Sequence, residues 1–330
     1  MHIRRKVNSW KLDKMKRRIA LVVLLPFLLV AIIVGNTLRF PAEVARIKTE
    51  QVGVKVQRDD AVERLSKAIS FPTVSFHDWS KVDQQAFTDL REFLQNSYPQ
   101  VFSKLAVELV DEHSYLLHWS GSDSSLKPIL LMAHMDVVPV PEESLSLWQH
   151  EPYSGAIAEG YVWGRGAIDN KAGVLAILES LDYLLEQEFQ PTRGIYIAFG
   201  QDEEVGGRLG AKSIAAVLSR RNVELEFVLD EGGYVVEDAM SGLASPLALV
   251  GVGEKGYLSL KLTVNGKGGH SSMPPVMTAA GRIARAVNRL QDNPFPVSFD
   301  SMAEFIRELG PEAPFSQRLI FGNRWLFEPL

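Results

Sequence analysis

The stretch GIYIAFGQDEEVGG (194–207) passes directly from an apolar run into three consecutive carboxylates. Residues 194–200 are typical of a buried strand, and the two glycines that follow the acidic run indicate a turn. Asp202, Glu203 and Glu204 repel one another wherever water is scarce. A chain tolerates such a run on a solvated surface, or where a cation offsets the repulsion. The end of this strand is therefore the first place to look for a bound cation.

Apolar runs and helical patterns alternate on both sides of this strand. Residues 128–133 (PILLMA) are continuously apolar, as expected of a strand covered on both faces. Helical spacing recurs at 172–187 and 210–220, and a further strand is expected at 224–230. This alternation predicts an α/β fold with a mixed, mostly parallel sheet and helices on both faces. Upstream, the pattern predicts helices at 59–70 and 83–98 and a hairpin of strands at 105–110 and 114–120.

After Gly256 the alternation of helices and buried strands stops. Residues 257–266 alternate between apolar and polar side chains with a period of two, which favours a strand with one solvated face. A turn follows at 269–275, and residues 278–291 have helical spacing. We therefore expect an α/β domain at 58–254 and the start of an α+β module at 255–330.

The N-terminus combines a basic block with a long apolar run. Residues 1–18 carry eight Lys or Arg side chains against one acid, a formal charge of +7. Residues 19–34 contain no polar side chain, and extension to Phe40 gives about twenty residues, near the length that spans a bilayer. Positive charge before the span predicts a cytoplasmic segment (1–18), a transmembrane anchor (19–40), a linker (41–57) and a body outside the cytoplasm, in the periplasm, a lumen or the extracellular space. A cleaved signal peptide and a buried core helix are the alternatives.

Composition excludes several classes of site. At 330 residues the chain is long enough for two domains. It contains no cysteine, which excludes disulfides, thiolate catalysis and thiolate metal sites, so any metal must bind through His, Asp and Glu. The total charge is −5, so the part after residue 18 carries −12, and we expect no nucleic-acid partner.

Polar side chains stand where three of the predicted strands end. They are His134 and Asp136 after the first, Asp202, Glu203 and Glu204 after the second, and Asp230 and Glu231 after the third, with Asp169 in a loop between the first two strands. Ligands bind beyond the carboxyl ends of parallel strands, so we expect these side chains to converge. One imidazole and several carboxylates suit Zn²⁺, Mn²⁺ or Co²⁺. Each of these polar groups taken alone is also typical of a solvated turn or a helix cap. Their common position at the ends of buried strands predicts a metal site.

Five motifs in this order carry a family resemblance: LMAHMDVVPV, WGRGAIDNKAG, FGQDEEVGG, VLDEGG and GKGGHSSMP. In order and approximate spacing they resemble the M20 metallopeptidases, which are dinuclear-zinc amidohydrolases, over residues 58–330. The N-terminal anchor and the motif VWGRGAIDNKAG are most similar to those of the branch that contains carboxypeptidase S and the N-fatty-acyl-amino-acid synthase/hydrolase. The resemblance implies the zinc-exopeptidase fold, with residues 58–254 as the N-terminal part of the catalytic domain. Residues 255–330 would then begin an inserted lid and dimerisation domain, through which a homodimer would form.

The resemblance also implies a ligand set for two Zn²⁺ ions, with Co²⁺ or Mn²⁺ as substitutes. His134 and Asp230 would bind one ion, Asp169 would bridge both, and Glu204 would bind the second. The family places a strained or cis peptide beside the bridging aspartate, which here is the Asp169–Asn170 bond.

Three further residues receive roles from the resemblance. Asp136 would stand behind the site and orient His134 or the general base. Glu203 would be that base. His270, from the second domain, would reach the substrate carboxylate or the tetrahedral oxyanion, often across a dimer.

The implied reaction is hydrolysis of the amide bond of a peptide with a free C-terminus, or of an N-acyl amino acid, by a metal-bridged hydroxide. M20 enzymes complete the second zinc site with a late histidine, whereas the last histidine of this sequence is His270. On this basis we expect a chain truncated at its C-terminus, with weak or absent turnover. The alternatives are a catalytically inactive module for binding or assembly, and an aminopeptidase-type metal enzyme.

Overall fold

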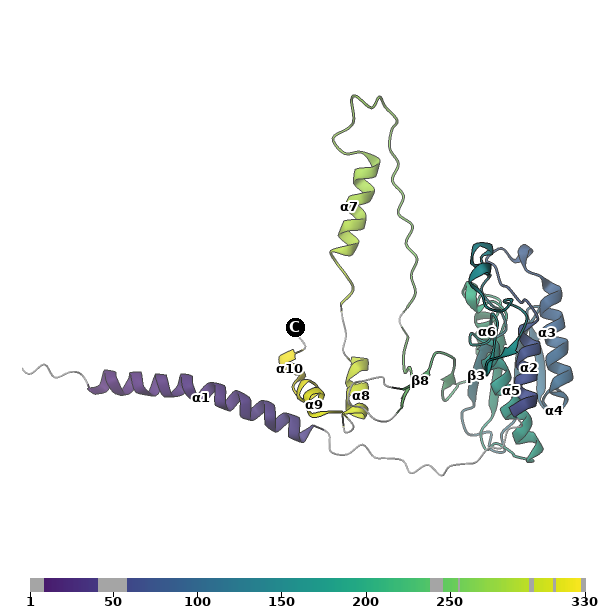
Figure 1. Ribbon diagram of the computed structural model, residues 1–330, viewed down its shortest axis with the longest axis horizontal. Helices are drawn as coiled ribbons and strands as arrows, with labels where there is room; N and C mark the ends of the chain where they lie inside the picture. Colours follow the sequence, from purple (N-terminus) through teal and green to yellow (C-terminus); the bar gives the residue numbers. More distant parts are fainter. Residues whose placement is uncertain are drawn as a thin grey trace, which may run out of the picture. The chain divides into compact units, whose positions relative to one another are not determined.

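The computed structural model describes residues 9–40, 58–237, 246–254, 256–296, 300–310 and 313–327 (Figure 1). Contacts between Cα atoms divide the chain into two units. One is Glu50–Gly232, and the other joins Met1–Thr49 to Gly233–Leu330. The expected linker at 41–57 lies outside the described residues.

The unit Glu50–Gly232 is built on a five-stranded sheet with the strand order β1-β2-β6-β3-β7. The strands are β1 (Ala106–Val110), β2 (Ser114–Trp119), β3 (Ile129–His134), β6 (Ile195–Gly200) and β7 (Val228–Leu229). β1 and β2 form the expected hairpin, and β2 also runs antiparallel to β6. β3 pairs parallel with both β6 and β7. β2 alone of the five therefore runs against the others, and the prediction of a mixed, mostly parallel sheet is confirmed.

Helices cover both faces of this sheet, as the alternating pattern predicts. They are α2 (Arg58–Ile69), α3 (Gln84–Ser97), α4 (Pro99–Lys104), α5 (Lys171–Glu186) and α6 (Ala211–Arg220). α3, α4 and α5 pack into one apolar core, and α6 packs into a second core on the opposite face (Figure 1). Val174, Leu178 and Leu181 of α5 are buried at helical spacing, which fixes the side of α5 that meets the sheet. Short elements complete the unit: η1 (Trp79–Lys81), η2 (Glu142–Leu147), β4 (Ile157–Ala158), β5 (Tyr161–Val162) and η3 (Glu203–Val205).

A charged network joins α2, α3 and α5. Arg64 binds Glu179 through two hydrogen bonds of 2.6 and 2.8 Å, and the hydroxyl of Tyr98 donates to the same carboxylate at 2.7 Å. Burial raises the pKa of Tyr98 and the Glu179 carboxylate raises it further, so the phenol stays protonated and keeps donating. One carboxylate thus holds side chains that precede and follow α3 against α5.

Substitution of Glu179 by glutamine is expected to lower the free energy of unfolding by about 1–3 kcal/mol, because an amide NH₂ replaces an oxygen that accepts from Arg64 and the charge that pairs with the guanidinium is lost. Urea unfolding of the purified chain measures this change. Glu186→Gln, an exposed position on the same helix, is the matched control and should change the value by less than about 0.5 kcal/mol. Equal losses in the two variants would show that the network is not stabilising.

The second unit contains the long helix α1 and several shorter elements. They are α1 (Ser9–Arg39), β8 (Tyr234–Val236), β9 (Leu247–Leu249), α7 (Ala279–Gln291), α8 (Asp300–Leu309), α9 (Phe315–Phe321) and α10 (Arg324–Phe327). β8 and β9 form an antiparallel hairpin. Within α1, Lys14–Arg39 is long and apolar enough to cross a membrane by length and composition, and Val22–Ile32 are exposed. A membrane anchor and a signal sequence both fit this helix.

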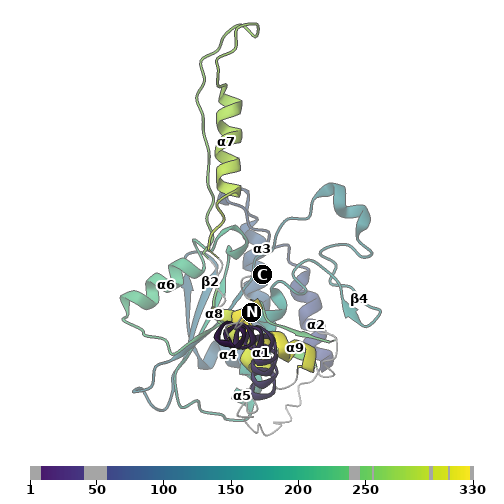
Figure 2. The same cartoon turned by 90° about the vertical axis from the view of Figure 1, so that its left-hand side faces the viewer.

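The prediction of a helix at 278–291 is confirmed by α7. The prediction of a strand at 257–266 is wrong, because these described residues form no strand. These residues are extended beside α7 without strand pairing (Figures 1 and 2). Tyr257, Leu258 and Leu260 are exposed. An alternating pattern supplies one face of a strand and not its hydrogen-bond partner, and no neighbouring strand lies there among the described residues.

Candidate metal centre

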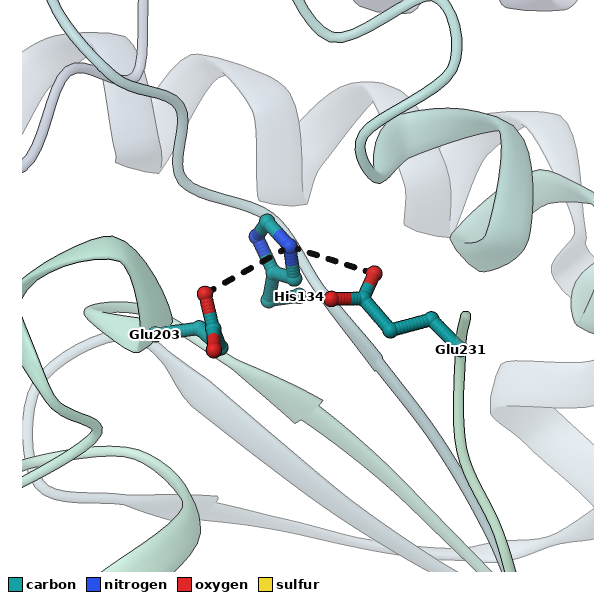
Figure 3. Close-up of side chains that lie close together, drawn as sticks. All are labelled: His134, Glu203 and Glu231. Atoms are coloured by element: carbon teal, nitrogen blue, oxygen red, sulfur yellow. Dashed lines mark ion pairs between the residues drawn. The ribbon is translucent and has the colours of Figure 1, made fainter. Parts of the chain in front are cut away.

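His134 is the last residue of β3 and the centre of the site. Its side chain is 3% exposed, and its Nδ1 lies 3.0 Å from the backbone oxygen of Asp136. An Nδ1–H that donates to this oxygen leaves Nε2 free to face the neighbouring carboxylates. Nε2 lies 2.9 Å from Asp169 Oδ1. Glu231 and Glu203 also approach it, with Oε2 of each at 3.4 Å and 3.8 Å respectively (Figure 3).

Two sets of side chains converge on this imidazole with atoms close enough to share an ion. In each set the potential ligand atoms lie within 4.8 Å of one another. The sets are His134, Asp169 and Glu204, and His134, Glu203 and Glu231. Imidazole nitrogen and carboxylate oxygen are ligands of Zn²⁺, Mn²⁺ and Co²⁺, and the chain has no thiolate to compete with them. The residues present therefore fit a divalent-metal site.

Asp136 holds the site together from behind. It is fully buried, and its carboxylate accepts hydrogen bonds from the backbone N–H of Glu203 at 3.0 Å, the backbone N–H of Glu204 at 3.1 Å and the Ser75 hydroxyl at 2.6 Å. Its Oδ1 also lies 3.3 Å from Nδ1 of His134. One carboxylate thus fixes the imidazole at the end of β3 and the two glutamates after β6.

Asp169 reaches the site from the loop before α5. The Asp169–Asn170 peptide bond is cis, as the resemblance implied. Asn170 caps α5 by accepting a hydrogen bond from the N–H of Gly173 at 3.1 Å. Lys171 is buried, and its ammonium donates to the backbone oxygens of Ala68 and Phe71. Burial lowers the pKa of Lys171 to about 7. Sequence reasoning missed Lys171, although a lysine at the first position of a buried helix is a signal that could have found it.

The site disfavours additional negative charge. Burial, together with the nearby Asp169 carboxylate, raises the pKa of Glu204 to about 7. Burial also raises the pKa of Glu203 and that of Glu231. Burial of His134 lowers the pKa of its imidazole, but the hydrogen bond and charge of Asp136 and the charges of Glu231 and Glu203 together outweigh it and raise the pKa to about 10. Clustered carboxylates around one imidazole favour a cation among them.

Metal-stripped protein is expected to lose stability as the pH rises from about 4.5 to about 7. Folded Glu204 keeps its proton to about pH 7, so in this window the folded state binds more protons than the unfolded state. Above pH 7 the raised pKa of His134 and the lowered pKa of Lys171 act on stability in opposite directions. Urea unfolding in chelator across this pH range measures the slope. Glu204→Gln should flatten the acidic part, and a stability that rises with pH there would contradict the predicted direction.

The two remaining predicted residues, Asp230 and His270, belong to neither ligand set. A cavity of about 390 Å³ is lined by His134, Glu203 and Asp230, among others. Asp230 belongs to neither ligand set, whereas its neighbour Glu231 does. Sequence reasoning noted both carboxylates at this strand end but selected Asp230 alone, because the family motif designated it. His270 is an exposed residue of the other unit, with its Nδ1 2.8 Å from the hydroxyl of Ser272.

Comparison with protein-family models matches residues 130–318 to the model described as Peptidase family M20/M25/M40. The chain is 40% identical over 296 residues to the N-fatty-acyl-amino acid synthase/hydrolase PM20D1 of Homo sapiens, covering 88% of this chain and 56% of that protein. It is 39% identical over 307 residues to the probable carboxypeptidase S-like 2 of Dictyostelium discoideum, covering 90% of this chain and 59% of that protein. The chain therefore spans a little over half the length of these relatives.

Solved structures give a weaker likeness. Human carnosine dipeptidase 1 aligns with a TM-score of 0.44 at 18% identity, over 53% of this chain and 38% of that chain. The di-peptidase Dug1p of Saccharomyces cerevisiae aligns with a TM-score of 0.43 at 21% identity, over 54% and 39% of the two chains. The assignment of the family therefore rests on the sequence matches alone.

Proposed function

Because the chain belongs to peptidase family M20/M25/M40, we propose that it is a metal-dependent hydrolase that cleaves the amide bond of a peptide with a free C-terminus or of an N-acyl amino acid. The observation that carries the proposal is the convergence of two carboxylate sets on one buried imidazole. The names of the relatives, a synthase/hydrolase of N-fatty-acyl amino acids and carboxypeptidases, support this class of substrate.

In this proposal His134, Asp169, Glu204 and Asp230 hold two Zn²⁺ ions, with Co²⁺ or Mn²⁺ as substitutes. Bound there, the ions would polarise the scissile carbonyl and acidify the attacking water. The chain's own contribution is to present one imidazole and several carboxylates in a hydrogen-bonded frame. Asp136 supplies that frame, because it accepts hydrogen bonds from the amides of both glutamates and orients His134.

Glu203 is the proposed general base. Its carboxylate is half exposed, and Glu203 lines the cavity beside His134. Burial raises its pKa, which improves its ability to hold a proton near neutral pH and release it again. Glu203 would take a proton from the attacking water and return it to the leaving amine nitrogen. His270 would donate to the substrate carboxylate or to the developing oxyanion, in a homodimer formed through the lid.

The proposal includes a membrane anchor formed by α1. Its helix Lys14–Arg39 has the required length and composition, and the basic residues before it favour a cytoplasmic N-terminus with the catalytic unit outside the cytoplasm. Extraction of membranes with alkaline carbonate tests the anchor. The chain should stay in the membrane pellet, and its release as soluble protein would contradict the proposal.

The catalytic proposal is tested by metal content and turnover measured together. Any hydrolysis that the chain performs on a panel of dipeptides with a free C-terminus, N-acetyl amino acids and N-fatty-acyl amino acids should disappear in chelator and return with added Zn²⁺. Elemental analysis should find a divalent metal bound to the wild-type chain. Turnover that chelation leaves unchanged, or wild-type protein without metal affinity, would overturn the proposal.

The end of β7 offers two carboxylates for one ligand position, and paired variants separate them. Asp230→Ala is expected to remove at least half of one metal equivalent, because its carboxylate is the proposed ligand. Glu231→Ala should leave metal content close to wild type and change turnover less. Elemental analysis after dialysis measures both variants. Greater metal loss in Glu231→Ala would move the ligand role to Glu231, whose Oε2 lies 3.4 Å from Nε2 of His134.

A further inference from the structure

A buried asparagine joins the end of α1 to the segment between α9 and α10. The side chain of Asn323 is fully buried, and its amide nitrogen donates to the backbone oxygen of Ile33 at 3.1 Å and to the Thr37 hydroxyl at 3.2 Å. Its amide oxygen accepts from the side chain of Asn36 at 3.1 Å. Thr37 is also buried, at 1% exposure. These hydrogen bonds link residues almost three hundred positions apart along the sequence.

The two segments approach closely because glycines stand at the contact. A Cβ atom on Gly310 would overlap the ring of Phe40. A Cβ atom on Gly322 would lie 3.1 Å from the backbone oxygen of Asn36. The rings of Phe40 and Phe321 lie 6.3 Å apart between centroids, and α1 and α9 lie side by side in both views (Figures 1 and 2). The contact therefore combines buried hydrogen bonds with close packing.

The position of this contact along α1 gives its depth relative to a membrane. Ile33 belongs to the unbroken apolar run 19–34, and Thr37 and Phe40 follow within about two turns. A hydrocarbon core about 30 Å thick takes about twenty helical residues, so a span that begins at residue 19 or 20 ends near residues 38–40. A helix packed against residues 33–40 therefore lies at the boundary between hydrocarbon and headgroups.

α9 and α10 expose side chains that suit this boundary. Phe315, Ile320 and Trp325 are about half exposed. Aromatic side chains, tryptophan above all, concentrate at the headgroup level of bilayers. The same short helices contain Arg318 and Arg324, which are both partly buried, and arginine is favoured beside lipid phosphates. Exposed aromatic and aliphatic side chains beside arginines are the composition expected of an interfacial segment.

We propose that α9 and α10 rest on the phospholipid surface, docked by Asn323 onto the membrane end of α1, with Phe315, Ile320 and Trp325 entering the interface. This inference rests on the proposed membrane anchor and is independent of the metal chemistry. The partner surface is the bilayer itself, and the chain then contacts it at two places that are far apart in the sequence.

The absence of cysteine makes a direct test feasible, because single cysteines can be labelled without background. The 330-residue chain with Ile320→Cys or Phe315→Cys, each carrying an environment-sensitive fluorophore, is reconstituted in phosphatidylcholine vesicles that contain headgroup-labelled or acyl-chain-labelled quencher lipids. Quenching is expected to be at least twofold stronger than for Val276→Cys, a fully exposed position of the same unit. Quenching no greater than at this control would overturn the proposal.

Two alanine variants, one at Asn323 and one at a control asparagine, test whether Asn323 docks α9 and α10 onto α1. In the Ile320→Cys background, Asn323→Ala should reduce quenching to the level of the Val276→Cys control, whereas Asn288→Ala, an exposed asparagine of α7, should leave it unchanged. Carbonate extraction of the same samples reports on α1. A chain that stays inserted but shows no quenching refutes this inference alone, and a chain released by carbonate refutes the anchor together with it. Metal content measured in parallel reports separately on the proposed function.

Discussion

Replacement of Glu203 by glutamine is expected to lower turnover by about 10²–10⁴-fold while leaving metal content close to wild type. Glutamine keeps the size of the side chain and its place in the cavity beside His134, but it cannot take a proton from water. The backbone N–H of Glu203, which donates to Asp136, is unaffected by the substitution. Elemental analysis and hydrolysis assays on the same preparation measure the two effects separately.

Glu204→Ala is the matched comparison for that variant, because the two residues are adjacent and share the support of Asp136. The carboxylate of Glu204 forms a ligand set with His134 and Asp169, so its removal is expected to lower metal occupancy first and activity as a consequence. High added Zn²⁺ should recover part of the activity of Glu204→Ala and none of the activity of Glu203→Gln. Equal zinc loss in both variants would refute this division of roles.

Asp136→Ala is expected to produce the second large effect, on stability and metal affinity together. The substitution leaves the amides of Glu203 and Glu204 and the Ser75 hydroxyl without their acceptor in a buried place. Each buried donor without a partner costs about 1–3 kcal/mol, so we expect a loss of at least about 3 kcal/mol in the free energy of unfolding. Loss of support behind a ligating histidine lowers metal affinity by about 10–100-fold.

Two milder variants separate these effects of Asp136→Ala. Ser75→Ala removes one donor and should cost about 1 kcal/mol with little change in metal affinity. Asp136→Asn keeps one acceptor oxygen and should fall between Ser75→Ala and Asp136→Ala. Metal titration is done at a temperature where circular dichroism shows each variant folded. Wild-type metal affinity in folded Asp136→Ala would refute the supporting role.

Much of the fold was predictable from periodicity. The apolar runs at 128–133 and 194–200 became neighbouring parallel strands, and the helical spacing at 172–187 became α5. The strand expected at 224–230 contracted to Val228–Leu229, and the one expected at 257–266 did not form. Periodicity records which side of a segment is apolar, whereas a strand also needs a hydrogen-bonded neighbour. That neighbour can be remote in sequence and leaves no local signal.

The sequence likewise predicted part of the candidate metal centre but not all of it. Placement at strand ends predicted that His134, Asp169, Glu203 and Glu204 would meet, and the structure brings them around one imidazole nitrogen. The roles that we assign to these four residues, as well as to Asp136, Asp230 and His270, rest on the family resemblance and stay predictions. Convergence at the end of β7 was expected for both Asp230 and Glu231, but the placement of Glu231 rather than Asp230 in a ligand set with His134 was not predictable. It depends on the path of a loop and on side-chain rotamers, which no pattern of residue types specifies.

The carboxylate of Asp136 makes the ends of β3 and β6 thermodynamically interdependent. His134 contacts the Asp136 carboxylate from the end of β3, and Glu203 and Glu204 contact it from the end of β6. Changes in the free energy of unfolding caused by substitutions at the two strand ends should therefore not be additive. A double-mutant cycle between the two strand ends should therefore show coupling, and a redesign of one end would need to include the other. A substitution of one proposed ligand that changes the metal preference would therefore disturb Glu203, the proposed general base, as well.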